Sequence, residues 1–282
     1  MSMPTHGQAG TRPKWSFEGR VAIVTGSARG IGRTIAGALG TAGAKVAVCD
    51  INRDAAEAAV KEFAKKGISA EHFPVDLSKP GEPGRMIDCV VERWGRLDIL
   101  VNNARAGVRR GPLEDTEENW DLTQSVALRA AYFASQRAIP VMAANGGGNI
   151  VNICSVAALL VSLESAAYHA AKAGLMQVTR YLAANAGTQG VRVNAVVPGF
   201  IVQDEHRQRY MNDDNAAYRA RAESCHPLRS VGRANDVAEA ALFLCSDSAG
   251  FITGQAIVVD GGFTIQDPWT VMSIAGRGGE GA

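Results

Sequence analysis

The chain has 282 residues, of which 46% are hydrophobic and 20% charged, and its formal net charge is +1. That length allows one large α/β domain or two small ones with a sizeable core. The balanced charge and the apolar content exclude a disordered chain and argue against a nucleic-acid binder, and no apolar run approaches the roughly 18 residues of a membrane span.

Residues 1–18 lack the apolar stretch of a secretion signal, so we interpret them as a flexible leader. The cysteines are odd in number and form no CxxC pair, which argues against a disulfide framework or a zinc site; they are Cys49, Cys89, Cys154, Cys225 and Cys245. The five histidines show no ligand spacing, and we expect no metal. Reduced thiols indicate a cytoplasmic protein.

Short β-branched runs alternate with Ala-rich helical stretches along most of the chain. Strands are expected at 20–25, 45–50, 69–76, 97–102, 148–155, 191–198 and 255–260, and helices near 30–42, 53–66, 82–94, 116–144, 164–186 and 234–246. Strands that are almost continuously apolar predict a parallel sheet buried on both faces. We therefore predict one Rossmann-type α/β domain, 19–265, with a doubly wound sheet of about seven strands and helices on both faces.

Two segments depart from this alternation. The highly charged stretch 203–226 interrupts it between a strand and a helix, and we interpret it as a substrate lid, with a solvated pair of surface helices as the alternative. The tail, 266–282, ends in a Gly-rich sequence and is expected to be frayed.

The first strand runs into the turn TGSARGIG, which contains Gly26, Gly30 and Gly32. Glycine permits positive φ and a close approach of a ligand to the backbone, and the helix that follows offers free N–H groups to a pyrophosphate. The spacing is GxxxGxG, a loose match to the general dinucleotide fingerprint. In this turn Arg29 and Ile31 are also candidates for cofactor contact.

Two carboxylates close the next two strands. Asp50 is placed to accept hydrogen bonds from an adenosine ribose and to repel a 2′-phosphate, which favours NAD over NADP, although Arg29 works in the other direction. Asp76, followed by Leu77, is placed to reach the adenine, or alternatively to cap the following helix.

The stretch NICSVAALLVSLESAAYHAAK carries the candidate catalytic residues. Ser155 lies at the end of a strand, and Tyr168 and Lys172, four residues apart, share one face of a helix. A phenol is a poor acid or base at neutral pH, and a neighbouring ammonium stabilises the phenolate. We expect Ser155 to hold a substrate oxygen while Tyr168 transfers its proton, with Lys172 also binding the nicotinamide ribose.

In these motifs the chain resembles a classical short-chain dehydrogenase/reductase from about Arg20 to Phe263. The resemblance implies that Asn103 and Ala104 contact the cofactor and that the Pro-Gly segment VVPGFI lines the nicotinamide through Pro198, Gly199 and Ile201. It also implies a homotetramer or homodimer packed through long helices and the last strand.

Three positions depart from the family pattern. Arg105 replaces a glycine, so the backbone there must avoid positive φ or tolerate strain, and its side chain points either into the active-site mouth or to solvent. Ala127 replaces the asparagine of a water-linked proton relay, for which Gln124 or Ser125 are the available substitutes. Gln203 replaces a threonine that contacts the nicotinamide carboxamide.

These features leave several functions open. The first is an oxidoreductase that transfers a hydride between NAD(H) and a secondary alcohol or ketone of a small or medium metabolite. The arginines of 105–110 and of 207–221 suggest an anionic substrate, although acidic residues are interleaved in the second group. The others are a nucleotide-binding sensor with weakened catalysis, a 3-oxoacyl-thioester reductase, and an epimerase or lyase that uses the cofactor internally.

Overall fold

The computed structural model describes residues 15–267 and 270–271. Most of the predicted leader and of the predicted tail therefore lies outside the described residues. Seven parallel strands form the main sheet in the order β3-β2-β1-β4-β5-β6-β9. They are β1 (Val21–Thr25), β2 (Lys45–Asp50), β3 (Ala70–Pro74), β4 (Ile99–Asn102), β5 (Gly148–Ile153), β6 (Val191–Pro198) and β9 (Ala256–Val259).

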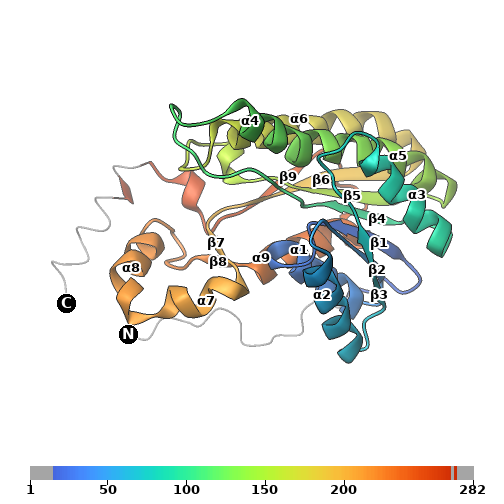
Figure 1. Cartoon of the computed structure of the whole chain (residues 1–282), viewed down its shortest axis with the longest axis horizontal. Coiled ribbons are helices and arrows are strands. Elements are labelled where there is room, and N and C mark those ends of the chain that lie inside the picture. Colours follow the sequence, from blue (N-terminus) through green and yellow to red (C-terminus); the bar gives the residue numbers. More distant parts are fainter. Residues whose placement is uncertain (1–14, 268–269, 272–282) are drawn as a thin grey trace.

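Helices cover both faces of this sheet (Figure 1). One face carries α1 (Gly30–Thr41), α2 (Arg53–Lys65) and α9 (Ala234–Cys245); the other carries α3 (Glu82–Trp94), α4 (Glu117–Gln124), α5 (Ala130–Ala144) and α6 (Ala166–Ala186). The predicted Rossmann-type α/β fold is confirmed. Within the described residues, no helix is both long and apolar enough to cross a membrane.

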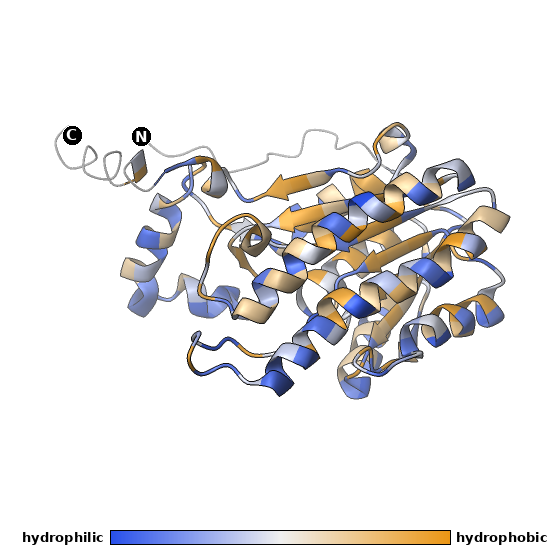
Figure 2. Ribbon diagram, turned by 90° about the horizontal axis from the view of Figure 1, so that it is seen from above, coloured by the Kyte–Doolittle hydropathy of each residue, from blue (hydrophilic) through white to orange (hydrophobic). Residues whose placement is uncertain are grey.

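The strands are apolar along their whole length because each face of the sheet is buried (Figure 2). In β2, Val46 and Val48 pack into the layer beneath α1 and α9, whereas Ala47 and Cys49 pack into the layer beneath α3 and α5. Side chains of a strand point alternately to its two faces, so one run of apolar residues serves both cores.

The boundaries differ from the prediction in two informative places. The third strand ends at Pro74, which leaves Asp76 in the loop that follows it. The helix predicted at 116–144 is interrupted at Ser125–Arg129, which forms a turn of π-helix between α4 and α5.

The charged stretch 203–226 folds as α7 (Asp204–Met211) and α8 (Ala216–Ser224). A two-stranded parallel sheet, β7 (Ile201–Val202) with β8 (Gly232–Arg233), joins the two ends of this excursion. Aromatic contacts of Phe200 with Tyr210 and Tyr218 hold the helix pair together. Its role as a lid stays a prediction.

The strand order reverses between β1 and β4, since successive strands lead outward in opposite directions from this point. In doubly wound sheets, ligands bind in the crevice at the carboxyl ends of the strands where this reversal occurs. We therefore expect the binding site at the loops that follow Thr25 and Asn102.

Candidate active site

The glycine-rich turn after β1 is packed tightly against the end of β4. Gly26 and Gly30 have φ of +62° and +57°, and a Cβ added to Gly32 would lie 2.3 Å from the carbonyl oxygen of Gly26. The Asn103 amide donates to the carbonyl oxygens of Thr25 (2.9 Å) and Gly26 (3.1 Å). Only glycine allows this backbone course.

The sequence analysis did not predict a role for Thr25. Its buried hydroxyl accepts hydrogen bonds from the backbone N–H groups of Asn103 (2.9 Å) and Ala104 (3.1 Å). The hydroxyl thus ties the two strand ends together at the reversal of the sheet. Its position immediately before the first glycine of the turn was the available signal.

The N-terminus of α1 is engaged by a carboxylate from α7. Oε1 of Glu205 accepts a hydrogen bond from the backbone N–H of Gly30 at 2.7 Å. Partial burial works to raise the pKa of Glu205, but hydrogen bonds from its own backbone and from Gly30 outweigh it, and the pKa lies below its usual value. The turn therefore binds an anionic oxygen, as the sequence predicts for a pyrophosphate.

The other members of the predicted turn are less constrained. Arg29 is exposed, and Ile31 packs against the apolar layer beneath α1. Gln203 lies close to the turn, because a Cβ added to Gly30 would meet its Oε1 at 2.4 Å. A cavity of about 640 Å³ adjoins Gly30 and Glu205 on the outer side of α1, but Ser155, Tyr168 and Lys172 do not line it.

Both predicted adenosine-binding carboxylates lie at the carboxyl edge of the sheet. Asp50 accepts hydrogen bonds from the N–H groups of Ala28 (3.0 Å) and Asn52 (2.9 Å), one on each oxygen. The hydrogen bond from the Ser78 hydroxyl (2.6 Å) lowers the pKa of Asp76. Leu77 is buried in the layer beneath α3 and α5.

Of the three predicted catalytic residues, Ser155 follows β5, and Tyr168 and Lys172 lie in α6. Ser155 lies two residues beyond the strand and accepts a hydrogen bond from the N–H of Ala157 at 3.2 Å. Tyr168 lies in the first turn of α6. The Lys172 side chain is 2% exposed; its ammonium donates to the carbonyl oxygen of Ile153 at 2.7 Å and lies 5.5 Å from the centre of the Tyr168 ring.

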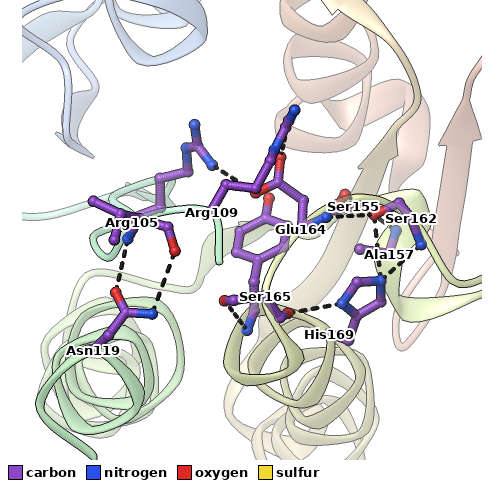
Figure 3. A network of polar contacts seen from close by, with 11 residues as sticks. Arg105, Arg109, Asn119, Ser155, Ala157, Ser162, Glu164, Ser165 and His169 are labelled. Carbon is purple, nitrogen blue, oxygen red and sulfur yellow. Dashed lines mark hydrogen bonds and ion pairs between the residues drawn. The ribbon is translucent and has the colours of Figure 1, made fainter. Parts of the chain in front are cut away.

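The neighbouring Cys and His residues have structural roles. Burial raises the pKa of Cys154 to about 11 although the Lys172 ammonium acts against it, so the thiol is neutral at physiological pH. The His169 ring contacts the backbone of Ser162 and Ser165 and holds the loop before α6 (Figure 3). Within the described residues no cluster of potential metal ligands is present.

Arg105 lies at the mouth of this site rather than turning fully to solvent (Figure 3). Its guanidinium carbon is 5.6 Å from the centre of the Tyr168 ring, and its Nη1 is 3.8 Å from Oε2 of Glu164. The other oxygen of Glu164 binds Arg109 at 2.6 Å. Arg105 is not among the residues with positive φ, so the loss of glycine carries no backbone strain.

Ala127 lies buried inside the π-helical turn between α4 and α5. Such turns occur frequently at functional sites. The side chain of Gln124, one of the two residues considered as its substitute, donates to the carbonyl oxygen of Ala167 at 2.8 Å and so reaches the first turn of α6. That contact places an amide beside the helix that carries Tyr168 and Lys172.

The Pro-Gly segment lies at the end of β6, at the same edge of the sheet. Pro198 is the last residue of that strand, and a Cβ added to Gly199 would lie 2.5 Å from Cβ of Asp260. Ile201 packs against the apolar layer beneath α1 and α9. The predicted cofactor and catalytic residues thus gather at the carboxyl ends of the strands.

The family model described as enoyl-(acyl carrier protein) reductase matches residues 26–264. The chain belongs to the short-chain dehydrogenase/reductase family. Proteins of this family use nicotinamide cofactors, and this member is an oxidoreductase that transfers a hydride at a CH–OH group.

Several relatives of this dehydrogenase/reductase cover nearly the whole domain. A probable galactose dehydrogenase of Rhizobium meliloti is 37% identical, and the alignment covers 86% of this chain and 94% of that protein. A putative short-chain alcohol dehydrogenase from Sinorhizobium meliloti is similar in structure, with a TM-score of 0.82 and 35% identity over 90% of this chain and 100% of that one.

A third similar protein is a gluconate 5-dehydrogenase from Burkholderia cenocepacia, solved in complex with NADP and tartrate. Its TM-score is 0.80 and its identity 31%, over 90% of this chain and 98% of that one.

Proposed function

We propose that this chain is an NAD(H)-dependent dehydrogenase or ketone reductase that acts on a secondary alcohol or ketone of a small or medium metabolite. The observation that carries the proposal is the burial of Lys172 beside Tyr168, with its ammonium held by the carbonyl oxygen of Ile153. Burying an ammonium costs free energy unless it is well bound, and such placements are found at functional sites.

The residues fit a nicotinamide dinucleotide. The N–H of Gly30 can bind an anionic oxygen, because it donates to the Glu205 carboxylate in this structure, and it would hold a phosphate of the cofactor. The carboxyl edge also provides Asp50 for a ribose diol and Asn103 to fix the turn. When bound, the cofactor accepts or donates the hydride.

The chain's own residues handle the substrate oxygen and its proton. In this proposal the Ser155 hydroxyl donates a hydrogen bond to that oxygen, and Tyr168 removes or returns the proton at its phenol oxygen. The Lys172 ammonium stabilises the phenolate, which is the base that takes the proton in the oxidation and the form left when the phenol gives its proton in the reduction. Lys172 also binds the nicotinamide ribose. Because the three groups are fixed by β5 and α6, proton transfer occurs in a prearranged geometry.

NAD is favoured over NADP because Asp50 would repel a 2′-phosphate. Arg29 is the counter-argument, since it is exposed in the turn and could pair with that phosphate. The similar gluconate 5-dehydrogenase was solved with NADP, so a direct comparison of the two cofactors is part of the test.

A nucleotide-binding protein with weakened catalysis is the second candidate. Two observations favour it: Ala127 has no polar group for a proton relay, and Glu205 engages the N–H of Gly30. The preserved arrangement of Tyr168 and Lys172 counts against it.

We further propose a homotetramer or homodimer in the cytoplasm. Large apolar side chains are exposed on α4, α5 and β9, among them Trp120, Phe133 and Val258. Such residues are typical of surfaces that are covered on association. The five cysteines are free thiols, in keeping with a reducing compartment. Light scattering of the purified protein gives the oligomeric state.

The test is Tyr168→Phe, with Tyr181→Phe as the matched control on the exposed side of the same helix. With a panel of secondary alcohols and NAD, we expect turnover to fall at least ~100-fold in the first variant, because general acid–base catalysis contributes about that much or more. The control and the NADH affinity, measured by fluorescence, should be unchanged. Unchanged turnover in Tyr168→Phe would show that Tyr168 does not transfer the proton.

A further inference from the structure

We propose that Arg105 binds the carboxylate of the substrate, which makes the substrate a short hydroxy or oxo acid. This inference rests on the proposed function and names the substrate class of the same site. Arg105 is then a specificity-determining residue that the family pattern, with glycine at this position, does not supply.

The guanidinium lies next to the group that handles the reacting oxygen. Its central carbon is 5.6 Å from the centre of the Tyr168 ring, while the Lys172 ammonium is 5.5 Å from that centre. When Tyr168 binds the substrate oxygen, the Arg105 guanidinium is therefore within reach of the groups attached next to the reacting carbon. A carboxylate one or two carbon atoms from the reacting carbon satisfies this geometry, because a planar guanidinium binds a carboxylate through two parallel hydrogen bonds.

Glu164 leaves Arg105 with unused binding capacity. It holds Arg109 in a hydrogen bond of 2.6 Å but lies 3.8 Å from Arg105, beyond hydrogen-bond distance. The two arginines and one glutamate leave one net positive charge at the mouth of the site. The Arg105 side chain is 57% exposed, so an incoming anion can reach it.

The loop that carries Arg105 is fixed, which a specific anion contact requires. The side-chain amide of buried Asn119 accepts a hydrogen bond from the N–H of Val108 (2.8 Å) and donates one to its carbonyl oxygen (3.3 Å) (Figure 3). Gly107 has φ +87°, and a Cβ there would lie 2.1 Å from the Thr123 hydroxyl. The loop is thus held on α4, and little of the binding energy is spent on ordering it.

The experiment compares acids with their neutral methyl esters, using 2-hydroxybutyrate and 3-hydroxybutyrate in both enantiomers with NAD or NADP. We expect the wild-type kcat/KM to be at least ~10-fold higher for one of the acids than for its ester. Arg105→Gln should lower that acid's kcat/KM by ~10- to 100-fold, the range expected for a hydrogen bond to a charged group, and leave the ester within about twofold. Arg105→Lys should recover part of the loss.

Arg110→Gln is the control, because Arg110 is an exposed arginine of the same loop that hydrogen-bonds to the backbone of Glu114. It should leave both substrates unchanged. Binding is measured separately by calorimetry with 3-hydroxy-3-methylbutyrate in the presence of the cofactor, since this tertiary alcohol cannot be oxidised. Its affinity should fall in Arg105→Gln by the same factor as kcat/KM.

The outcomes separate the two proposals. Turnover of neutral secondary alcohols without preference for an acid, or an equal loss of acid and ester in Arg105→Gln, overturns the carboxylate contact and leaves the dehydrogenase standing. Arg105-dependent binding of the tertiary acid without turnover of any alcohol supports the contact and overturns the catalytic proposal. If the tertiary acid shows no Arg105-dependent binding and no alcohol is turned over, both proposals are overturned.

Discussion

Asp50 has a structural role in addition to the role in ribose binding that we propose for it. The sequence predicted a carboxylate for the adenosine ribose, and the structure adds that both of its oxygens already accept backbone hydrogen bonds, from Ala28 and Asn52. The bond from Ala28 connects the end of β2 to the glycine turn, whereas the bond from Asn52 is local. Together the two bonds fix the carboxylate at the carboxyl edge of the sheet.

Replacing Asp50 with Ala should therefore weaken NADH binding by ~10- to 100-fold, because ribose hydrogen bonds are lost and two N–H groups lose their acceptor. NADPH binding should fall less, since the repulsion of the 2′-phosphate disappears. Fluorescence titration of both cofactors measures the change, with Asp54→Ala in the exposed first turn of α2 as the control. Equal losses for the two cofactors would reduce Asp50 to a structural role.

At the scale of the elements, the charged excursion is where the sequence was least informative. The composition of 203–226 marked this segment as unusual, but it did not show which of its residues would contact the glycine-rich turn after β1. The decisive contact joins Gly30 to Glu205, which lie 175 residues apart. A long-range hydrogen bond of this kind depends on how β7 and β8 orient α7, and local propensity contains no information on that orientation.

The position of Glu205 implies competition between α7 and the cofactor. Glu205→Ala should tighten NADH binding by ~3- to 10-fold, because the diphosphate no longer has to displace a hydrogen bond worth ~1 kcal/mol at the N–H of Gly30. Asp204→Ala, the exposed neighbour in the same helix, should have a smaller effect. The readout is the NADH dissociation constant, and weaker binding in Glu205→Ala would mean that α7 supports the cofactor.

For the whole molecule, the sequence predicted the sheet well and the site in part. Apolar runs between helical stretches identify a sheet buried on both faces, and the motifs placed Ser155, Tyr168 and Lys172 at its carboxyl edge. The sequence did not predict the π-helical turn at Ser125–Arg129, and it left open whether Arg105 points into the active-site mouth or to solvent. Both depend on packing between segments that carry no shared sequence signal.

The two apolar layers share one sheet, so the domain should unfold as a unit. Leu39 is fully buried in the layer beneath α1, and Ile87 is fully buried in the layer beneath α3. Leu39→Ala and Ile87→Ala should each lower the free energy of unfolding by ~2–5 kcal/mol. Circular dichroism and tryptophan fluorescence should report the same single midpoint in both variants, while Leu113→Ala, 98% exposed, should change little. We expect one transition because the shared sheet cannot lose the packing on one face and keep that on the other. Two separated transitions, each sensitive to one variant, would mean that the two layers are independent folding units.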